Sequence, residues 1–137
     1  MTTKRRVAIA FAACVSLAAS PFQGPQVNHV MREKLGHAQK ILEAVVTSDW
    51  VNLETHSRQL EHLTDDPRWV VLKYPEYARQ SAMFREAVRD LRAAAAERNL
   101  ETTPKAYVAV TLKCVECHRY LARQRIAAAK NDEAFKP

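Results

Sequence analysis

Two cysteines and a histidine lie close together near the end of the chain, in the stretch TLKCVECHRYL, residues 111–121. Cys114 and Cys117 are three residues apart, and His118 follows directly. Two thiols at this spacing can each add to one vinyl group of a single porphyrin, and an imidazole one residue later can bind its iron. The pattern therefore indicates one covalently bound haem c, with Cys114 and Cys117 as thioether anchors and His118 as the proximal iron ligand.

Other uses of this pattern fit the chain less well. A thioredoxin-like pair normally starts a helix beside a sheet, and the sequence has no strand–helix–strand pattern. A zinc site needs four ligands, and no second C-x-x-C or close histidine pair supplies them. A haem-free helical module with a Cys114–Cys117 disulfide stays open as an alternative. The sequence offers no nucleophile–base constellation and no phosphate loop, so we expect no enzyme activity.

The first twenty residues have the layout of a secretory signal peptide, with a basic start, an apolar run and small residues. We expect cleavage between residues 18 and 24 and export to the periplasm, where free thiols do not persist. The apolar run is short for a membrane span, although an uncleaved anchor is an alternative. The segment FAAC also loosely resembles a lipoprotein box, which would keep Cys14 as a lipid-anchored N-terminus.

The net charge of the whole chain is +6. It falls to +3 without the leader, because residues 1–20 carry Lys4, Arg5 and Arg6 and no acidic residue. The basic residues are dispersed and form no dense patch, so we expect no nucleic-acid partner.

The rest of the chain reads as helix, with only two glycines in 137 residues. Helices are predicted over 26–46, 49–63, 75–98 and 103–129, with 64–75 as a longer connection. Asp49 and Thr103 are the expected N-terminal caps of the second and fourth helices. Short links favour antiparallel neighbours, so we expect an all-α, up-down four-helix bundle over 26–129 and a frayed tail over 130–137.

Each predicted helix has an apolar stripe at helical spacing. In the first helix the expected stripe is Val27, Met31, Leu35, Ala38, Leu42 and Val45; in the second it is Leu53, Ser57, Leu60 and Leu63; in the third it is Tyr77, Phe84, Val88, Leu91 and Ala95. In the fourth helix Cys114, Cys117 and His118 share an arc of about 100° with Tyr107, Val110 and Leu121.

A C-x-x-C-H motif near the C-terminus of a four-helix bundle resembles the class II c-type cytochromes, which include cytochrome c′ and its low-spin relatives. The resemblance covers about residues 26–125, and VMREKLGHAQKILEAV is more loosely similar to the first helix of that family. It implies that this helix packs over the haem face opposite His118. Low-spin members supply a methionine there, which implies Met31 as the distal iron ligand, whereas five-coordinate members leave a pocket for small gases.

The sequence thus predicts a periplasmic one-electron carrier that exchanges electrons with periplasmic or membrane redox proteins. Binding of nitric oxide or carbon monoxide at a five-coordinate iron is the alternative, in which Met31 only packs. By their position on the predicted helices, His29, His37, His56, His62 and Lys34 are weaker candidates for the sixth ligand. The resemblance also implies that a homodimer is compatible with this fold.

Overall fold

The computed structural model describes residues 25–69 and 74–134, and every regular element in these ranges is helical. The elements are α1 (Pro25–Thr47), α2 (Trp50–His62), the short 3-10 turn η1 (Leu63–Asp65), α3 (Pro75–Ala96) and α4 (Thr102–Ala134). This confirms the all-α prediction. The predicted signal peptide and Cys14 lie outside the described residues. None of the described helices combines the length and the apolar character that a membrane span requires.

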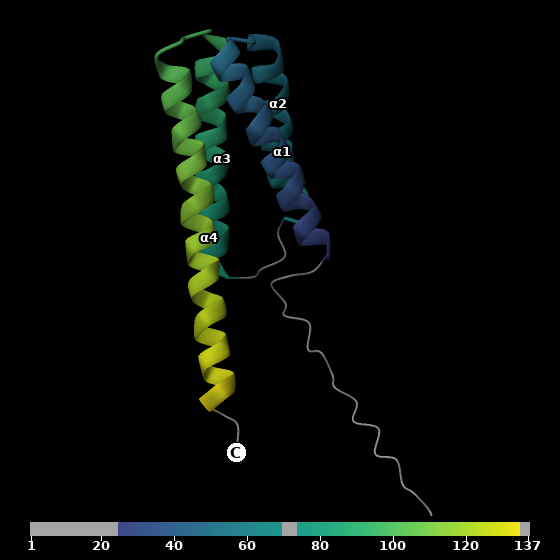
Figure 1. Cartoon of the computed structure of the whole chain (residues 1–137), viewed down its shortest axis with the longest axis vertical. Helices are drawn as coiled ribbons and strands as arrows, with labels where there is room; N and C mark the ends of the chain where they lie inside the picture. The colour runs from purple at the N-terminus through teal and green to yellow at the C-terminus, as the bar shows by residue number, and fades with distance from the viewer. Residues whose placement is uncertain (1–24, 70–73, 135–137) are drawn as a thin grey trace, which may run out of the picture.

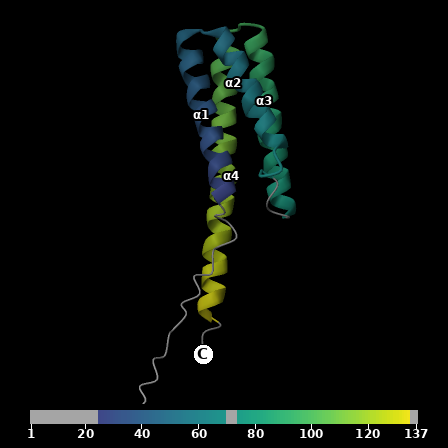
Figure 2. The ribbon, with the colours of Figure 1, turned by 90° about the vertical axis from the view of Figure 1, so that its right-hand side faces the viewer.

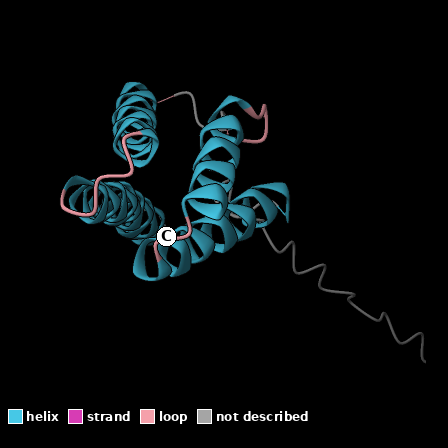
Figure 3. Ribbon diagram, turned by 90° about the horizontal axis from the view of Figure 1, so that it is seen from above, coloured by secondary structure: helices cyan, strands magenta, loops and turns pink. Residues whose placement is uncertain are grey.

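The four helices lie side by side, and each runs antiparallel to the one before it (Figure 1). Contacts are extensive between α1 and α2, between α2 and α3 and between α3 and α4, while α1 and α4 meet over a shorter stretch. Seen from above, the helices surround a common interior, as expected of a four-helix bundle (Figure 3). The last part of α4 projects beyond the ends of the other helices (Figure 2).

One of the two predicted caps is confirmed and the other is wrong. The Asp49 side chain accepts a hydrogen bond from the Asn52 amide at 3.1 Å and caps α2. At the start of α4 it is Asn99 whose side chain accepts from the Thr102 amide, at 3.0 Å. Thr103 lies inside the helix and is buried, with no hydrogen-bond partner for its hydroxyl oxygen. The extra turn before Pro104 moves the capping position back along the chain.

The predicted apolar stripes of α2 and α3 form much of the core. Leu53, Ser57 and Leu60 are buried on α2, and all five predicted residues are buried on α3. These helices have neighbours on two sides, and their leucines and the Phe84 side chain lie on the buried face, so periodicity predicts this side correctly.

The predicted stripe of α1 is wrong by one residue. Leu35 and Leu42 are 58% and 47% exposed, and the side chains that α1 buries are Val30, Lys34, Ile41 and Ala44. One residue corresponds to a rotation of about 100° around the helix. The prediction places apolar residues on the buried face. In the structure that face includes a lysine, and two leucines lie on the exposed face.

The end of the long connection is attached to α3. Trp69 is buried, and its indole nitrogen donates to the Ser81 hydroxyl at 3.0 Å. The Tyr77 hydroxyl donates to the Trp69 carbonyl oxygen. These bonds hold the Trp69 ring in the interior beside Phe84, with the ring centroids 5.6 Å apart.

The core predicts a clear contrast between two residues of α2. Leu60 is fully buried, whereas Val51 is 73% exposed. Leu60→Ala should lower the free energy of unfolding by about 2–5 kcal/mol, because it removes buried methyl groups and leaves a cavity. Val51→Ala should change it by less than about 0.5 kcal/mol. Denaturant unfolding followed by circular dichroism measures both, and equal effects would contradict this description of the core.

Candidate functional site

The C-x-x-C-H motif lies in the middle of α4, where helical spacing places its three functional side chains on one face. Cys114 and Cys117 are both free thiols and both half-buried. His118 is exposed on the next position of the same face. The structure therefore brings together the three residues that the sequence singled out, with no disulfide between the cysteines.

Protein covers this half of α4 only in part. Thr103 and Val110 are buried, but no described side chain from residue 111 to residue 128 is. Cys114 packs against the edge of the hydrophobic core, and Met31 of α1 packs against the same core. The motif thus stands at the boundary between the packed end of the bundle and a stretch that the other helices leave partly uncovered.

A hydrogen bond between α1 and α4 sets the level of the two helices. The Tyr107 hydroxyl donates to the Ala38 carbonyl oxygen at 3.1 Å. Because the helices run antiparallel, equal steps away from this bond reach equal levels, at about 1.5 Å per residue. Met31 is seven residues before Ala38, and Cys114 is seven residues after Tyr107. The register therefore places Met31 and Cys114 at about the same height, and both pack against the hydrophobic core.

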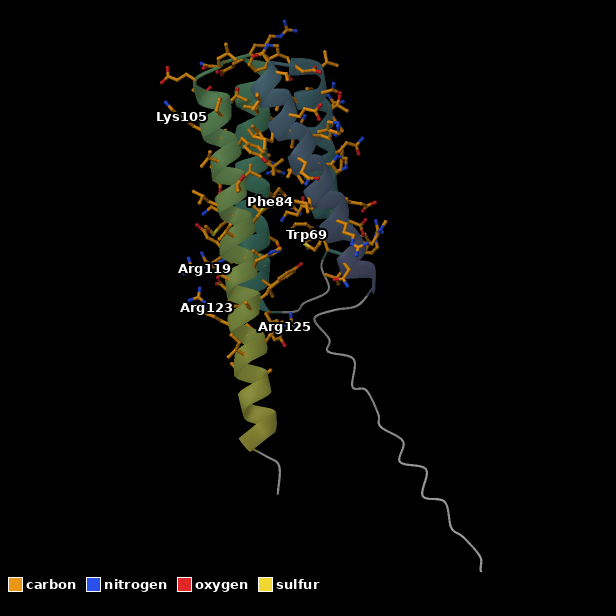
Figure 4. The ribbon with its side chains drawn as sticks, in the orientation of Figure 1. Trp69, Phe84, Lys105, Arg119, Arg123 and Arg125 are labelled. Carbon is orange, nitrogen blue, oxygen red and sulfur yellow. The ribbon has the colours of Figure 1, made fainter. Side chains whose placement is uncertain are left out.

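Lys34 is the unexpected member of the site. It is only 7% exposed, and its ammonium nitrogen lies 3.5 Å from the centroid of the Phe84 ring and 4.5 Å from that of Trp69. Both rings lie in the interior, between α1 and the α3–α4 pair (Figure 4). No carboxylate pairs with this amine in the part of the chain that the structure describes. We call Lys34, Trp69, Tyr77 and Phe84 the aromatic–lysine cluster.

The aromatic–lysine cluster and the motif influence each other electrostatically. Burial lowers the pKa of Lys34, and the two cysteines, when ionised, oppose this effect. Burial raises the pKa of Cys117, which Cys114 raises further and Lys34 opposes. Burial raises the pKa of Tyr77 to about 12, with a further contribution from Cys117. These groups therefore share one poorly solvated space.

His118 responds to the same charge from the edge of this space. Although the residue as a whole is exposed, the protein around its imidazole lowers its pKa, and the positive charge of Lys34 lowers it further. Both effects favour the neutral imidazole, which is the form that binds a metal.

The other histidines do not join the motif. His37 and His56 face each other between α1 and α2, with their Nδ1 atoms 3.1 Å apart. His37 is half-buried between these two helices. His29 contacts Glu33 at 3.2 Å, and His62 is exposed at the end of α2. A pocket of about 210 Å³ beside His56 contains none of the predicted site residues.

Within the described ranges, no three His, Cys, Asp or Glu side chains form a cluster that could hold a metal ion by themselves. No protein-family model, curated protein or solved structure matches this chain. The site itself has two free thiols and one imidazole on a helix face, near a hydrophobic core that contains aromatic rings and contacts a buried amine.

The His37–His56 contact predicts a pH dependence of stability. Burial and the neighbouring His56 lower the pKa of His37, while Glu33 opposes them. The folded state then prefers the neutral ring, so this stabilisation is complete above about pH 6.5, the ordinary histidine value, and is lost as the pH falls through the lowered pKa. Urea unfolding at pH 7.5 and 5.5 should show a smaller difference for His37→Gln than for the unaltered protein.

The control for this measurement is His62→Gln, which changes an exposed histidine of α2. It should keep the pH dependence of the unaltered protein. An unchanged pH dependence in His37→Gln would show that the pair does not couple protonation to folding.

Proposed function

We propose that this protein is a periplasmic monohaem c-type cytochrome that carries one electron at a time. The observation that carries the proposal is the C-x-x-C-H face of α4, with two free, half-buried thiols, of which Cys114 packs against the hydrophobic core. The spacing is the one that covalent haem attachment requires.

The residues of the site fit a haem in three respects. The two thiols lie on one helix face at the spacing of the vinyl groups, and the imidazole follows on the same face. The stretch of α4 beyond Val110 has apolar side chains that protein covers only partly. Cys114 also packs against the hydrophobic core, which contains Trp69 and Phe84, and apolar surroundings suit an extended aromatic ligand.

Each residue then has a defined role. Cys114 and Cys117 hold the porphyrin through thioether bonds, and His118 binds the iron from the side of α4. Met31 is the candidate distal ligand, since α1 places it at the level of the motif and against the same core as Cys114. When bound, haem c supplies an iron that cycles between the ferric and ferrous states.

The chain's own contribution to electron transfer is to exclude water from part of the haem and to leave an edge accessible. Trp69 and Phe84 belong to the buried core against which Cys114 packs, whereas His118 and Arg119 are exposed on α4. An accessible edge suits brief encounters with periplasmic or membrane redox proteins, which use small and weak interfaces.

Gas binding at a five-coordinate iron is the second candidate function, and one observation favours it. Met31 lies about 100° from Val30, which is at the centre of the buried face of α1, and is only half-buried. If this side chain only packs against the core, the distal side stays open to nitric oxide or carbon monoxide.

Optical spectra of the chain matured with a haem c attachment system separate the two functions. The electron carrier predicts a low-spin ferric spectrum with a methionine-to-iron charge-transfer band and little response of the ferrous protein to carbon monoxide. Met31→Ala should remove that band, whereas Met83→Ala, a half-buried methionine of α3, should keep it. A high-spin spectrum with ready carbon monoxide binding in the unaltered protein would contradict ligation by Met31 and favour gas binding.

A further inference from the structure

We propose that Lys34 is a buried cation that raises the reduction potential of the haem attached to Cys114 and Cys117. The inference rests on the proposed function, but concerns a residue that neither the motif nor the apolar pattern of α1 identifies. It assigns to Lys34 a tuning role beside the haem, distinct from iron ligation.

The surroundings of Lys34 hold a positive charge without neutralising it. The ammonium nitrogen lies over the faces of Phe84 and Trp69, at 3.5 and 4.5 Å from their centroids. The negative faces of aromatic rings attract a cation and offset part of the cost of its burial. A lysine paired with a carboxylate would present little net charge to its neighbours, whereas protonated Lys34 has no carboxylate partner among the described residues.

Two acidic side chains, one next to Lys34 in sequence and one that acts on Cys117, contact other residues. Glu33 of the same helix contacts His29 at 3.2 Å and Arg68 at 3.6 Å. Glu76, which acts on Cys117 from α3, accepts hydrogen bonds from Arg79 and Gln80 at 2.6–2.8 Å. Neither carboxylate forms an ion pair with Lys34 in the described part of the chain.

The charge of Lys34 also reaches the residues that would hold the haem. Lys34 contacts two rings of the core against which Cys114 packs, and its charge acts on both cysteines and on His118. The vinyl groups that react with the cysteines and the propionates occupy opposite halves of a porphyrin. A cation that acts on both cysteines would therefore lie closer to the attached half of a bound porphyrin than to its propionates, which would not neutralise it directly.

A fixed positive charge favours the state of the iron that carries one more electron. In the poorly solvated space around Lys34, this interaction is screened much less than in water. Removal of the charge should therefore make the ferrous state less favourable, without changing which side chains bind the iron.

Potentiometric titration of the matured, full chain at pH 7 tests the proposal with Lys34→Gln. At a fixed applied potential, its ferrous-to-ferric ratio should be at least tenfold lower than that of the unaltered protein, which corresponds to a potential about 59 mV lower for one electron. Lys34→Arg should have a ferrous-to-ferric ratio close to that of the unaltered protein, because it keeps the positive charge. The matched control is Lys40→Gln, an exposed lysine of α1, which should change the ratio less than twofold.

Each outcome bears on the proposal. Equal ratios for Lys34→Gln and the unaltered protein would overturn it, and so would a loss of the low-spin spectrum in Lys34→Gln, which would make Lys34 an iron ligand. If Lys34→Gln does not fold, Lys34→Leu gives the same comparison with an apolar side chain. An absence of covalent haem in the unaltered chain would instead end the proposed function itself, so the two failures are distinguishable.

Discussion

The main physical constraint on this molecule is that the rest of the protein covers the second half of α4 only in part. The first half of this helix packs against α3 and α1, and Tyr107 is bonded to the backbone of α1 at Ala38. Beyond Val110 every described side chain through residue 128 is at least partly exposed, although the face includes two thiols and Leu121. A helix with an apolar face needs a partner for it. The proposed haem, attached to that face through Cys114 and Cys117, would be such a partner.

Most of the fold, but not the face of α1, could be predicted from the sequence. The stripes of α2 and α3 contain most of the buried apolar residues of these helices, so periodicity finds their buried side. On α1 the leucines at 35 and 42 are exposed and Lys34 is buried, which reverses the usual assignment of residue types. Only the contacts of Lys34 with aromatic rings from other parts of the chain explain its burial, and such contacts leave no periodic signal.

The candidate site, like the fold, could be predicted only in part from the sequence. The spacing of Cys114, Cys117 and His118 places them on one helix face, and local geometry is sufficient to predict this. The aromatic–lysine cluster joins α1 to Trp69 of the long connection and to α3, which follow much later in the sequence. Periodicity predicts that Phe84 is buried, but its contact with a lysine depends on the rotation of α1.

These features support one physical account, in which covalent attachment and a buried charge act on the same haem. The thioether bonds would hold the cofactor where few protein contacts do, and the unpaired cation would set how readily its iron accepts an electron. Cys114 and Cys117 are central to this account, because the proposed roles of His118, Met31 and Lys34 all depend on a haem held there.

The most direct test is the mass of the intact protein after expression with a haem c attachment system, followed by mass analysis of its peptides. The account predicts a chain heavier than the polypeptide by one haem, with all of the added mass on the peptide that contains Cys114 and Cys117. A chain with the mass of the polypeptide alone, or lighter by the two hydrogens lost in a Cys114–Cys117 disulfide, would contradict it.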